Sequence, residues 1–395
     1  TYTSFGTYLV TLTVTDSDGD TDTDICKIVV GPENAIFIDG GSNVQITNCQ
    51  ITMHGGKFGI FLRHADSCTI GGPNVADGNT IIAFENTIHL DKNWAADGSD
   101  LNTIRNNDIT AHYRHSIYIE HDSDNNNILE NTITGMKNYG NDWSDRDGAI
   151  YLGSGCGNSN INDNQITINQ GFGMSIESNS NTIDNNQIGN RANHYISRGI
   201  KILGDSNTIS DNTMNTDSGL FISHGDNNII TDNIANAAEL GIGLNVGGGA
   251  TGNTISGGFY ADTSDSSPDM NACADETNTF RNIDWSGTRI FLLNDVAVFN
   301  YNYEATGDIW LQTSMPSLSG TEIEYIHRDI YSWSEELIEW RDYAEERVAH
   351  YRLSGLKDGE FYDIFDNGES VIRKQATGGI IEFNTVYDWG SWSIY

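Results

Sequence analysis

Two short strings alternate along most of this chain, and they constrain its fold more than any other feature. The first reads small-apolar-x-apolar, as in AIFI from position 35 and SIYI from position 116. The second reads N-T-I-x-x-N-x-I, as in NTIRNNDI from position 102. Copies of the first begin 20 to 33 residues apart, and period-2 alternation broken by Gly, Asn and Asp is typical of short strands with tight corners. The pattern predicts an all-β solenoid with one coil per period.

One asparagine recurs at the same place in the second string. We expect a ladder at a corner, in which each side-chain amide bonds its counterparts in the coils above and below. Asparagine also tolerates the left-handed backbone angles that corners need. In the first two coils Cys49 and Pro73 take that place. The column is Asn107, Asn131, Asn164, Asn186, Asn212 and Asn233.

These strings resemble the repeats of the right-handed parallel β-helix shared by NosD-like proteins, polysaccharide lyases and many archaeal surface proteins. The resemblance covers residues 33–285. NosD proteins are linked to copper delivery, but this chain has no Met-rich or Cys/His cluster suited to copper, so that role is not implied here. The chain also resembles disaggregatase-type enzymes of methanogenic archaea, and this resemblance implies a polysaccharide-cleaving enzyme as a second possible function.

The two ends differ from the repeats. Residues 1–32 contain GTYLVTLTVTDSDG, which resembles the second half of an immunoglobulin-like PKD domain and implies an extracellular or cell-surface location. With only half of that domain present, its exposed strand edge could pair with neighbouring copies of the chain. Residues 286–395 carry aromatic-rich strands such as TRIFLL and predict an antiparallel β-sandwich-like module. Within it, helical spacing predicts one short helix, with Ser332 and Glu335 as its capping box and Leu337, Trp340, Ala344, Val348 and Tyr351 on its apolar face.

Charge and cysteine usage exclude several functions. The chain has 55 Asp and Glu residues against 20 Lys and Arg residues, a formal net charge of −35. Such a surface repels phosphate backbones and anionic lipids, so we expect no nucleic-acid partner. No apolar run reaches the ~18 residues of a membrane span. Five cysteines without a C-x-x-C pair argue against a zinc site and leave one disulfide or inert thiols open.

Side chains alternate along a strand, so the third letter of each first string and the residue two further on should form two outward columns. The first column includes His89, Tyr118, Tyr151 and Lys201, and the second includes Arg63, Asp91, Glu120 and Glu177, with His121 just beyond. The polar members gather in the middle coils. The long insertions cluster there too, and they carry Trp94, Tyr139, Trp143 and Tyr195.

A catalytic site on this face is one hypothesis. Asp91 with Glu120, or Glu120 with Glu177, could approach the ~5 Å or ~6.5–9.5 Å carboxylate separations of glycoside hydrolysis, and repulsion between stacked carboxylates should raise one proton affinity. A lyase would use Lys201, His121 or Tyr118 as its base, with Arg63 or a calcium ion neutralising a uronate. The alternative is that these residues form simple cross-rung ion pairs. The candidate substrate-binding residues are His89, Trp94, Tyr139, Trp143, Tyr151 and Tyr195.

Calcium is the cofactor that the acidic turns indicate. Two Gly-containing turns place carboxylates at alternate positions, where hard oxygen ligands suit calcium. A solvated turn is the alternative for each of them. The candidate ligands are Asp16, Asp18 and Asp20 in the first turn and Asp142, Asp145 and Asp147 in the second.

Two functions remain open from the sequence. The first is an extracellular structural or adhesive β-helix protein that self-assembles or holds polysaccharide, and the lack of a recognisable catalytic signature favours it. The second is a polysaccharide lyase or glycoside hydrolase that acts on the exposed face of the β-helix.

Overall fold

A computed structural model describes the chain in two compact units, residues 1–208 and 209–395. Among the described residues no helix is long and apolar enough to cross a membrane. No α-helix occurs among them either, and the one helical segment is a 3-10 turn, η1 (Val75–Asp77). The description leaves out residues 1–5, 16–20, 31–32, 54–56, 93–97, 136–147, 192–195, 238–242, 248, 263–269, 273–276, 282, 286–289, 295–298, 303–308, 315–322, 334–336, 344–347, 367–368, 387–389 and 395.

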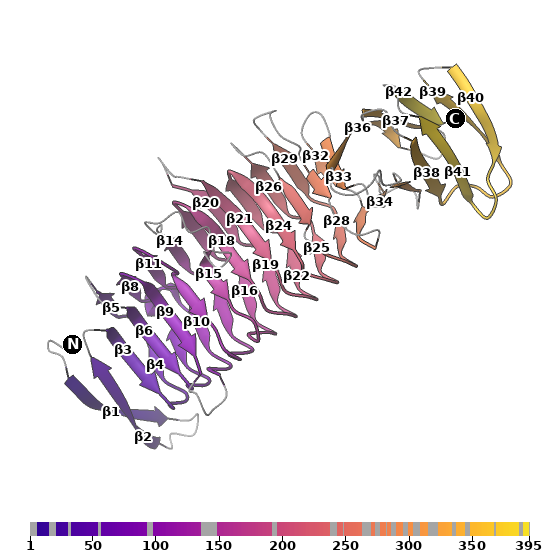
Figure 1. The fold of residues 1–395 in the computed structure, drawn as a ribbon. Coiled ribbons are helices and arrows are strands. Elements are labelled where there is room, and N and C mark those ends of the chain that lie inside the picture. The colour runs from indigo at the N-terminus through magenta and orange to yellow at the C-terminus, as the bar shows by residue number, and fades with distance from the viewer. Residues whose placement is uncertain are drawn as a thin grey trace. The chain divides into compact units, whose positions relative to one another are not determined.

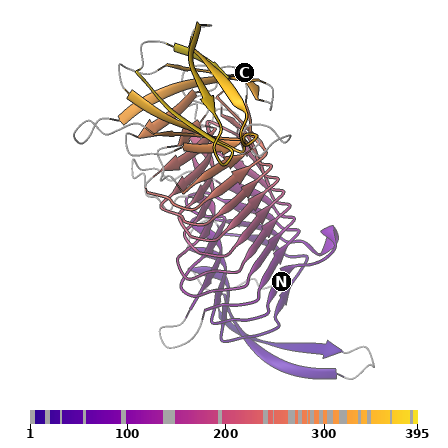
Figure 2. The ribbon, with the colours of Figure 1, turned by 90° about the vertical axis from the view of Figure 1, so that its right-hand side faces the viewer.

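The first unit is a parallel β-solenoid in which each coil contributes one strand to each of three sheets (Figure 1). Figure 2 shows its coils following one another as parallel turns. Sheet 1 contains β3 (Asn34–Asp39), β6 (Phe58–Arg63), β9 (Asn86–Asp91), β12 (Ile117–Ile119), β15 (Gly148–Leu152), β18 (Gly171–Ile176) and β21 (Ser197–Ile202). Sheet 2 contains β4 (Gln45–Ile46), β7 (Thr69–Gly71), β10 (Thr103–Arg105), β13 (Asn127–Leu129), β16 (Asn160–Asn162) and β19 (Thr182–Asp184). Sheet 3 contains β5 (Gln50–Thr52), β8 (Thr80–Ala83), β11 (Asp108–Ala111), β14 (Thr132–Gly135), β17 (Gln165–Ile168) and β20 (Gln187–Asn190).

The repeat positions of the sequence become the core of this solenoid. The second and fourth letters of the first string pair in register from coil to coil, for example Ile88, Ile117 and Ile150. All three are fully buried. Burying an isoleucine contributes about 1.5–3 kcal/mol, and a coil alone is too thin to supply that burial. Neighbouring coils therefore stabilise each other, as in other repeat proteins, and the predicted solenoid is confirmed.

The predicted asparagine ladder is present in both units. Its buried side chains donate to the next member at 2.9–3.1 Å, for example from Asn107 to Asn131 and from Asn131 to Asn164. One expected position is wrong, because Asn79 rather than Pro73 precedes Asn107 in the ladder. The left-handed backbone angle also belongs to another residue: it lies at the residue before each ladder asparagine from Asn107 to Asn233, as at Glu130 with φ 55°.

A second ladder, which the sequence analysis missed, lines the corner that leads into sheet 2. It is built on the first asparagine of the N-T-I string. The side chain of Asn102 accepts from the backbone N–H of Cys68, and Asn126 accepts in turn from that of Asn102. In the coil after that, the hydroxyl of Ser159 takes the place of the amide and accepts from the backbone N–H of Asn126. Buried polar side chains therefore fix two corners of these coils, and an unpaired buried amide would cost about 1–3 kcal/mol.

The second unit begins with parallel strands and ends with antiparallel ones. Its parallel strands are β23 (Thr213–Thr216), β24 (Ser218–Ser223), β25 (Ile229–Thr231), β26 (Ile234–Ala237), β27 (Leu244–Gly247), β28 (Thr254–Ser256), β29 (Phe259–Asp262), β30 (Met270–Ala272), β31 (Thr279–Arg281), β32 (Asp284–Trp285), β33 (Ile290–Asn294) and β34 (Phe299–Asn302). β22 (Thr208–Ser210) contains the boundary between the units. The antiparallel strands are β35 (Trp310–Ser314), β36 (Ile323–Trp333), β37 (Ile338–Tyr343), β38 (Val348–Ser354), β39 (Phe361–Asp366), β40 (Glu369–Gln375), β41 (Ile380–Val386) and β42 (Gly390–Ile394).

The short helix predicted in this region is wrong. Ser332 lies in β36, Trp340 lies in β37, and Val348 and Tyr351 lie in β38. The buried rings of Trp340 and Tyr351 pack with their centroids 5.6 Å apart. Packing between strands decides the structure here and overrides a helical spacing that is only a weak local preference. The predicted antiparallel module at the C-terminus is confirmed.

At the N-terminus, β1 (Gly6–Thr15) and β2 (Thr21–Val30) form an antiparallel hairpin. Its identification with part of a PKD domain stays a prediction, as do the domain boundaries at residues 32 and 285. Cys49 and Cys156 are free thiols. Burial raises the pKa of the Cys156 thiol to about 12, which makes it inert as a nucleophile near neutral pH.

Candidate functional site

The two outward columns of sheet 1 lie in the register that the sequence predicts. Phe37, Phe61, His89, Tyr118 and Tyr151 follow one another on successive strands. Their ring centroids are 4.6–5.0 Å apart at each step. Aromatic contacts of this kind contribute about 0.5–1.5 kcal/mol each beyond their buried area. The column is thus an aromatic stack along one face of the solenoid.

Two rings of this stack are closed to solvent. His89 is 5% exposed and Tyr151 is 3% exposed. The expectation that both rings lie open to a sugar chain is therefore wrong for the structure as described, because neighbouring rings and coils cover them. Tyr118 is partly exposed, and it marks where the stack meets the polar column.

His115 supports the stack from the preceding corner. Its Nδ1 lies 2.6 Å from the carbonyl oxygen of Gly148, and its ring stacks on Tyr118. Burial lowers the pKa of His115 to about 4. The neutral ring therefore contributes to stability above its unfolded pKa of 6.5, and this contribution is lost as the pH falls from 6.5 towards about 4.

We expect the free energy of unfolding to fall by about 3 kcal/mol across this window through His115 alone. Carboxylates titrate in the same range, so the measurement is a difference between proteins. Denaturant unfolding of wild type and His115→Gln at a series of pH values should show the two curves converging on acidification. His112→Gln, at an exposed histidine nearby, should run parallel to wild type. Parallel curves for His115→Gln would contradict the assignment.

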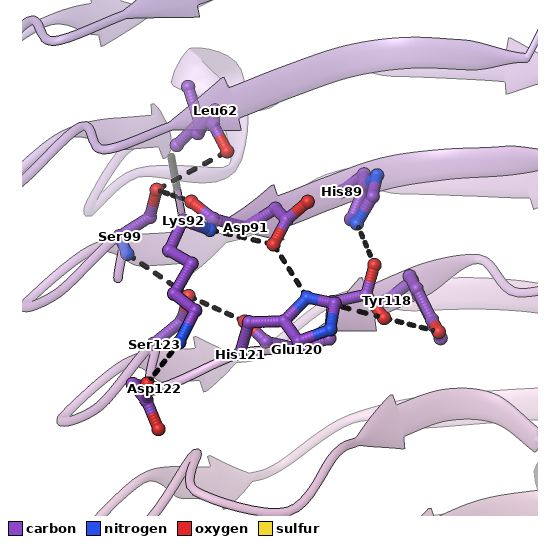
Figure 3. Close-up of polar contacts among 10 residues, drawn as sticks. All are labelled: Leu62, His89, Asp91, Lys92, Ser99, Tyr118, Glu120, His121, Asp122 and Ser123. Carbon is purple, nitrogen blue, oxygen red and sulfur yellow. Dashed lines mark hydrogen bonds and ion pairs between the residues drawn. The ribbon is translucent and has the colours of Figure 1, made fainter. Parts of the chain in front are cut away.

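The polar cluster is centred on Glu120, which follows β12 directly (Figure 3). The hydroxyl of Tyr118 donates to Glu120 Oε2 at 2.7 Å, and His89 Nε2 lies 3.1 Å from Glu120 Oε1. Because a carboxylate only accepts, the His89 ring donates through Nε2. Both oxygens of Glu120 are thus engaged by donors.

His121 and Asp91 form the second part of the cluster. His121 Nδ1 lies 2.8 Å from Asp91 Oδ1 and 3.7 Å from Glu120 Oε2. The same Asp91 oxygen accepts from the backbone N–H of Lys92 at 2.7 Å. Asp91 therefore holds the proton of His121 on Nδ1 and leaves Nε2 as the basic nitrogen. The His121 side chain is 56% exposed, so this ring reaches solvent.

Two serines tie together the backbone that carries these side chains. The hydroxyl of Ser99 donates to the carbonyl oxygen of Asp91 at 2.8 Å, and its backbone N–H donates to Ser123 Oγ. The hydroxyl of Ser123 donates to the carbonyl oxygen of Glu120 at 2.8 Å. Hydrogen bonds therefore connect the chain segments that follow β9 and β12, and the carboxylates of the two coils are held side by side (Figure 3).

The turn after Glu120 places two consecutive residues in the left-handed region. His121 and Asp122 both have positive φ, at 54° and 56°. Such angles cost free energy for residues other than glycine, and His64 adopts one in the equivalent turn two coils earlier. Across the turn, Lys92 Nζ donates to Asp122 Oδ2 at 2.5 Å. This clamp holds the turn that presents the imidazole of His121.

The pKa of Glu120 is lowered, whereas repulsion between stacked carboxylates would raise it. Burial alone would raise it, but the hydrogen bonds from His89 and Tyr118 and the nearby His89 and His121 together lower it below its usual value. The expectation of a raised proton affinity is thus wrong for Glu120. This carboxyl is ionised near neutral pH and cannot serve as an acid there.

The solenoid also has counterparts among known proteins. Residues 26–212 match the model of the right handed beta helix region. No curated protein matches the sequence. Among solved structures, the chain is similar to ORF18 of Geobacillus virus E2 at 12% identity, covering 91% of this chain and 68% of that one with a TM-score of 0.41. An alginate lyase from a Paenibacillus strain is similar at 16% identity, 69% and 76% coverage and a TM-score of 0.30.

A third similar structure is a tailspike mutant of the E. coli bacteriophage HK620 in complex with a pentasaccharide. It is 10% identical, covers 91% of this chain and 70% of its own length, and has a TM-score of 0.40.

On the β-helix, Arg63 lies beside the cluster but is engaged by another residue. Its guanidinium makes two hydrogen bonds with the carboxylate of Asp39. These bonds raise the pKa of Arg63 above its usual value. An arginine whose charge is already matched is a poor partner for a uronate, so the structure weakens the proposed neutralising role of Arg63.

The Arg63–Asp39 pair is partly exposed, with 33% and 42% of the two side chains accessible. Solvent screens such pairs, so we expect Asp39→Asn to lower the free energy of unfolding by less than about 1 kcal/mol. Denaturant unfolding at low and high salt measures this. A larger loss of stability would contradict the expectation that solvent screens the Arg63–Asp39 pair.

The remaining predicted residues divide into two groups. Glu177 and Lys201 lie further along the β-helix, on or just after β18 and β21, and Lys201 is buried with Nζ 5.6 Å from the centre of the Phe172 ring. Neither joins the Glu120 cluster, and a buried Lys201 cannot act as an exposed base. The other predicted residues lie outside the described part of the chain: Trp94, Tyr139, Trp143, Tyr195, Asp16, Asp18, Asp20, Asp142, Asp145 and Asp147.

Four residues of the site were missed from sequence. They are Lys92, Ser99, Asp122 and Ser123, which hold the two coils together. The repeat gives no signal for them because they lie in corners whose length varies. Among the described residues, the group able to hold a metal ion is His89, Asp91 and Glu120, whose ligand atoms all lie within 4.8 Å of one another.

Proposed function

We propose that this protein is an extracellular polysaccharide-binding enzyme that cleaves uronate-containing chains by β-elimination, with His121 as the general base. The observation that carries the proposal is the Asp91–His121 hydrogen bond of 2.8 Å beside the engaged carboxylate of Glu120. A histidine oriented by a carboxylate and open to solvent suits proton abstraction near neutral pH. The extracellular location rests on the resemblance of residues 1–32 to part of a PKD domain.

The chemistry is that of a lyase. His121 Nε2 removes the proton from the carbon next to the uronate carboxyl group. The electron pair of that C–H bond forms a carbon–carbon double bond, and the glycosidic C–O bond breaks. The leaving oxygen takes a proton from water. Asp91 stabilises the imidazolium that forms, as carboxylates do in other histidine pairs.

Hydrolysis is the less favoured reaction. Asp91 and Glu120 lie close enough for a carboxylate pair, since their ligand atoms are within 4.8 Å. Hydrolysis also needs one carboxylic acid with a raised pKa to protonate the leaving group, whereas the pKa of Glu120 is lowered. Elimination needs no such acid, so the geometry supports a lyase better than a glycoside hydrolase.

A structural or adhesive role is the second candidate, and one observation favours it. His89 and Tyr151 are buried in the stack, and Lys201 is buried further along the same face, so part of this face serves packing between coils. In this reading the cluster is a cross-rung network, and the exposed strand edge of residues 1–32 pairs with other copies. Sedimentation analysis over a range of concentrations would detect that association.

The test is direct incubation with a panel of uronate-containing and neutral polysaccharides. Elimination creates an unsaturated uronate that absorbs in the ultraviolet, whereas hydrolysis creates only new reducing ends. We expect both signals from an acidic polysaccharide and neither from a neutral one. Reducing ends without ultraviolet absorbance would replace elimination by hydrolysis. Binding without either signal would favour the adhesive role.

A further inference from the structure

We infer that His89, Asp91 and Glu120 bind one divalent transition-metal ion, with Zn²⁺ as the representative cation. One ligand atom from each residue lies within 4.8 Å of the others. An ion placed among them would therefore need only small side-chain movements to reach the ~2.0–2.2 Å bonds that zinc makes with nitrogen and oxygen. The site differs from the calcium turns expected from sequence in both its residues and its ligand type.

The backbone fixes these three side chains before any ion arrives. His89 and Asp91 lie two residues apart on β9, on the same face of the strand. Glu120 comes from the next coil, and the pairing of His89 with Tyr118 sets its height. The Ser99 and Ser123 hydrogen bonds lock both backbone segments. A preorganised site of this kind loses little conformational freedom on binding.

Charge favours a cation here. Asp91 and Glu120 place two carboxylates together. The arginine and the lysine beside them are engaged elsewhere, because Arg63 binds Asp39 and Lys92 binds Asp122. The nearest basic ring, His121, contacts both carboxylates through its Nδ1 side. A divalent ion would balance the two carboxylates, as charges in partly buried sites require.

The ligand chemistry selects the type of ion. An imidazole nitrogen with two carboxylates suits zinc and its neighbours in the first transition row. Calcium prefers six to eight oxygen ligands, and this cluster offers one nitrogen. Figure 3 shows the Asp91 carboxylate between His121 and the side of the cluster that carries His89, so Asp91 can orient His121 with one oxygen and face the ion with the other.

The inference concerns the same cluster as the proposed lyase reaction and adds a partner to it. An ion in this position would lie next to His121, where it could attract the carboxylate of a uronate. Metal binding does not require cleavage, however, so it is measured without a polysaccharide. A protein that binds the ion but cleaves nothing would refute the lyase and keep the metal site.

The experiment is calorimetric titration of the full chain, purified without a histidine tag and stripped with a chelator, with Zn²⁺ and separately with Ca²⁺. Co²⁺ absorption in the visible range reports nitrogen and oxygen coordination. We expect one Zn²⁺ per chain and weaker binding of Ca²⁺. His89→Phe, Asp91→Asn and Glu120→Gln keep the side-chain shapes, and each should weaken Zn²⁺ binding by at least about tenfold, since even outer-sphere changes cost about 10–100-fold.

His112→Gln is the matched control, because it removes an exposed imidazole of the same coil and leaves the cluster intact. It should bind Zn²⁺ as wild type does. The inference is overturned if no stoichiometric Zn²⁺ binding occurs, if Ca²⁺ binds more tightly than Zn²⁺, or if His89→Phe binds Zn²⁺ unchanged. Circular dichroism of each variant separates loss of the site from loss of the fold.

Discussion

Replacing His121 by glutamine is expected to lower the rate of polysaccharide cleavage by about 10²–10⁴-fold, the usual contribution of a positioned general base. Glutamine can still donate towards Asp91 but cannot take up a proton. Substrate affinity should change little, because the imidazole acts in the chemical step. Initial rates of ultraviolet absorbance at several substrate concentrations separate the two effects.

His64→Gln is the matched control for this variant. His64 occupies the equivalent turn position two coils earlier, and its φ of 49° is close to the 54° of His121. Both substitutions therefore impose similar backbone demands on glutamine, while only one removes the ring beside Asp91. If both variants cleave at the wild-type rate, His121 is not part of the mechanism. If both variants cleave more slowly than wild type, the turns matter for activity and base catalysis by His121 is not supported.

The second large effect is expected on stability, at the asparagine ladder. Asn164 is fully buried, and its side-chain amide donates to Asn186 Oδ1 and to the carbonyl oxygen of Ile128, both at 2.9 Å. Its own oxygen accepts from the backbone N–H and the side chain of Asn131. Asn164→Ala leaves several of these groups without partners, at about 1–3 kcal/mol each. We expect a loss of about 3–5 kcal/mol in the free energy of unfolding.

Hydrogen exchange localises this loss. The amide of Asn131 should exchange much faster in Asn164→Ala, because its acceptor is gone. Asn236→Ala provides the control, since Asn236 is only partly buried and makes a comparable 2.9 Å amide contact with Asn215 at the exposed surface. Its loss should be below about 0.5 kcal/mol, as for other surface substitutions. Similar losses in the two variants would show that burial does not control the ladder's contribution.

The solenoid and the gathering of Asp91, Glu120 and His121 could be predicted from sequence for one reason. In a parallel stack, equal positions in successive repeats lie above one another, so sequence spacing translates directly into neighbours. Ile88 above Ile117 and His89 above Tyr118 follow from that rule alone. The rule needs no knowledge of side-chain packing. It therefore predicts neighbours correctly even for residues that lie a whole coil apart in the sequence.

The wrong predictions have two causes: corners of irregular length, and side-chain contacts that the repeat spacing does not determine. Pro73 was expected in the ladder, but η1 adds residues after β7 and moves the ladder position to Asn79. The pKa direction of Glu120 failed because it depends on which donors reach each oxygen, and Tyr118 and His89 were assigned to another role. Register fixes the height of a side chain, whereas donors and solvent exposure depend on three-dimensional packing.

One further consequence follows from the corner between sheets 3 and 1. β14 ends at Gly135 and β15 begins at Gly148, whereas β17 ends at Ile168 and β18 begins at Gly171. The two neighbouring coils nevertheless remain aligned strand to strand, β14 with β17 and β15 with β18. The number of residues at this corner can therefore differ between coils without changing how their strands pair. A guest peptide grafted between Asn169 and Gln170 would be presented on a rigid support whose remaining strands need not adjust, which makes this chain a natural display scaffold.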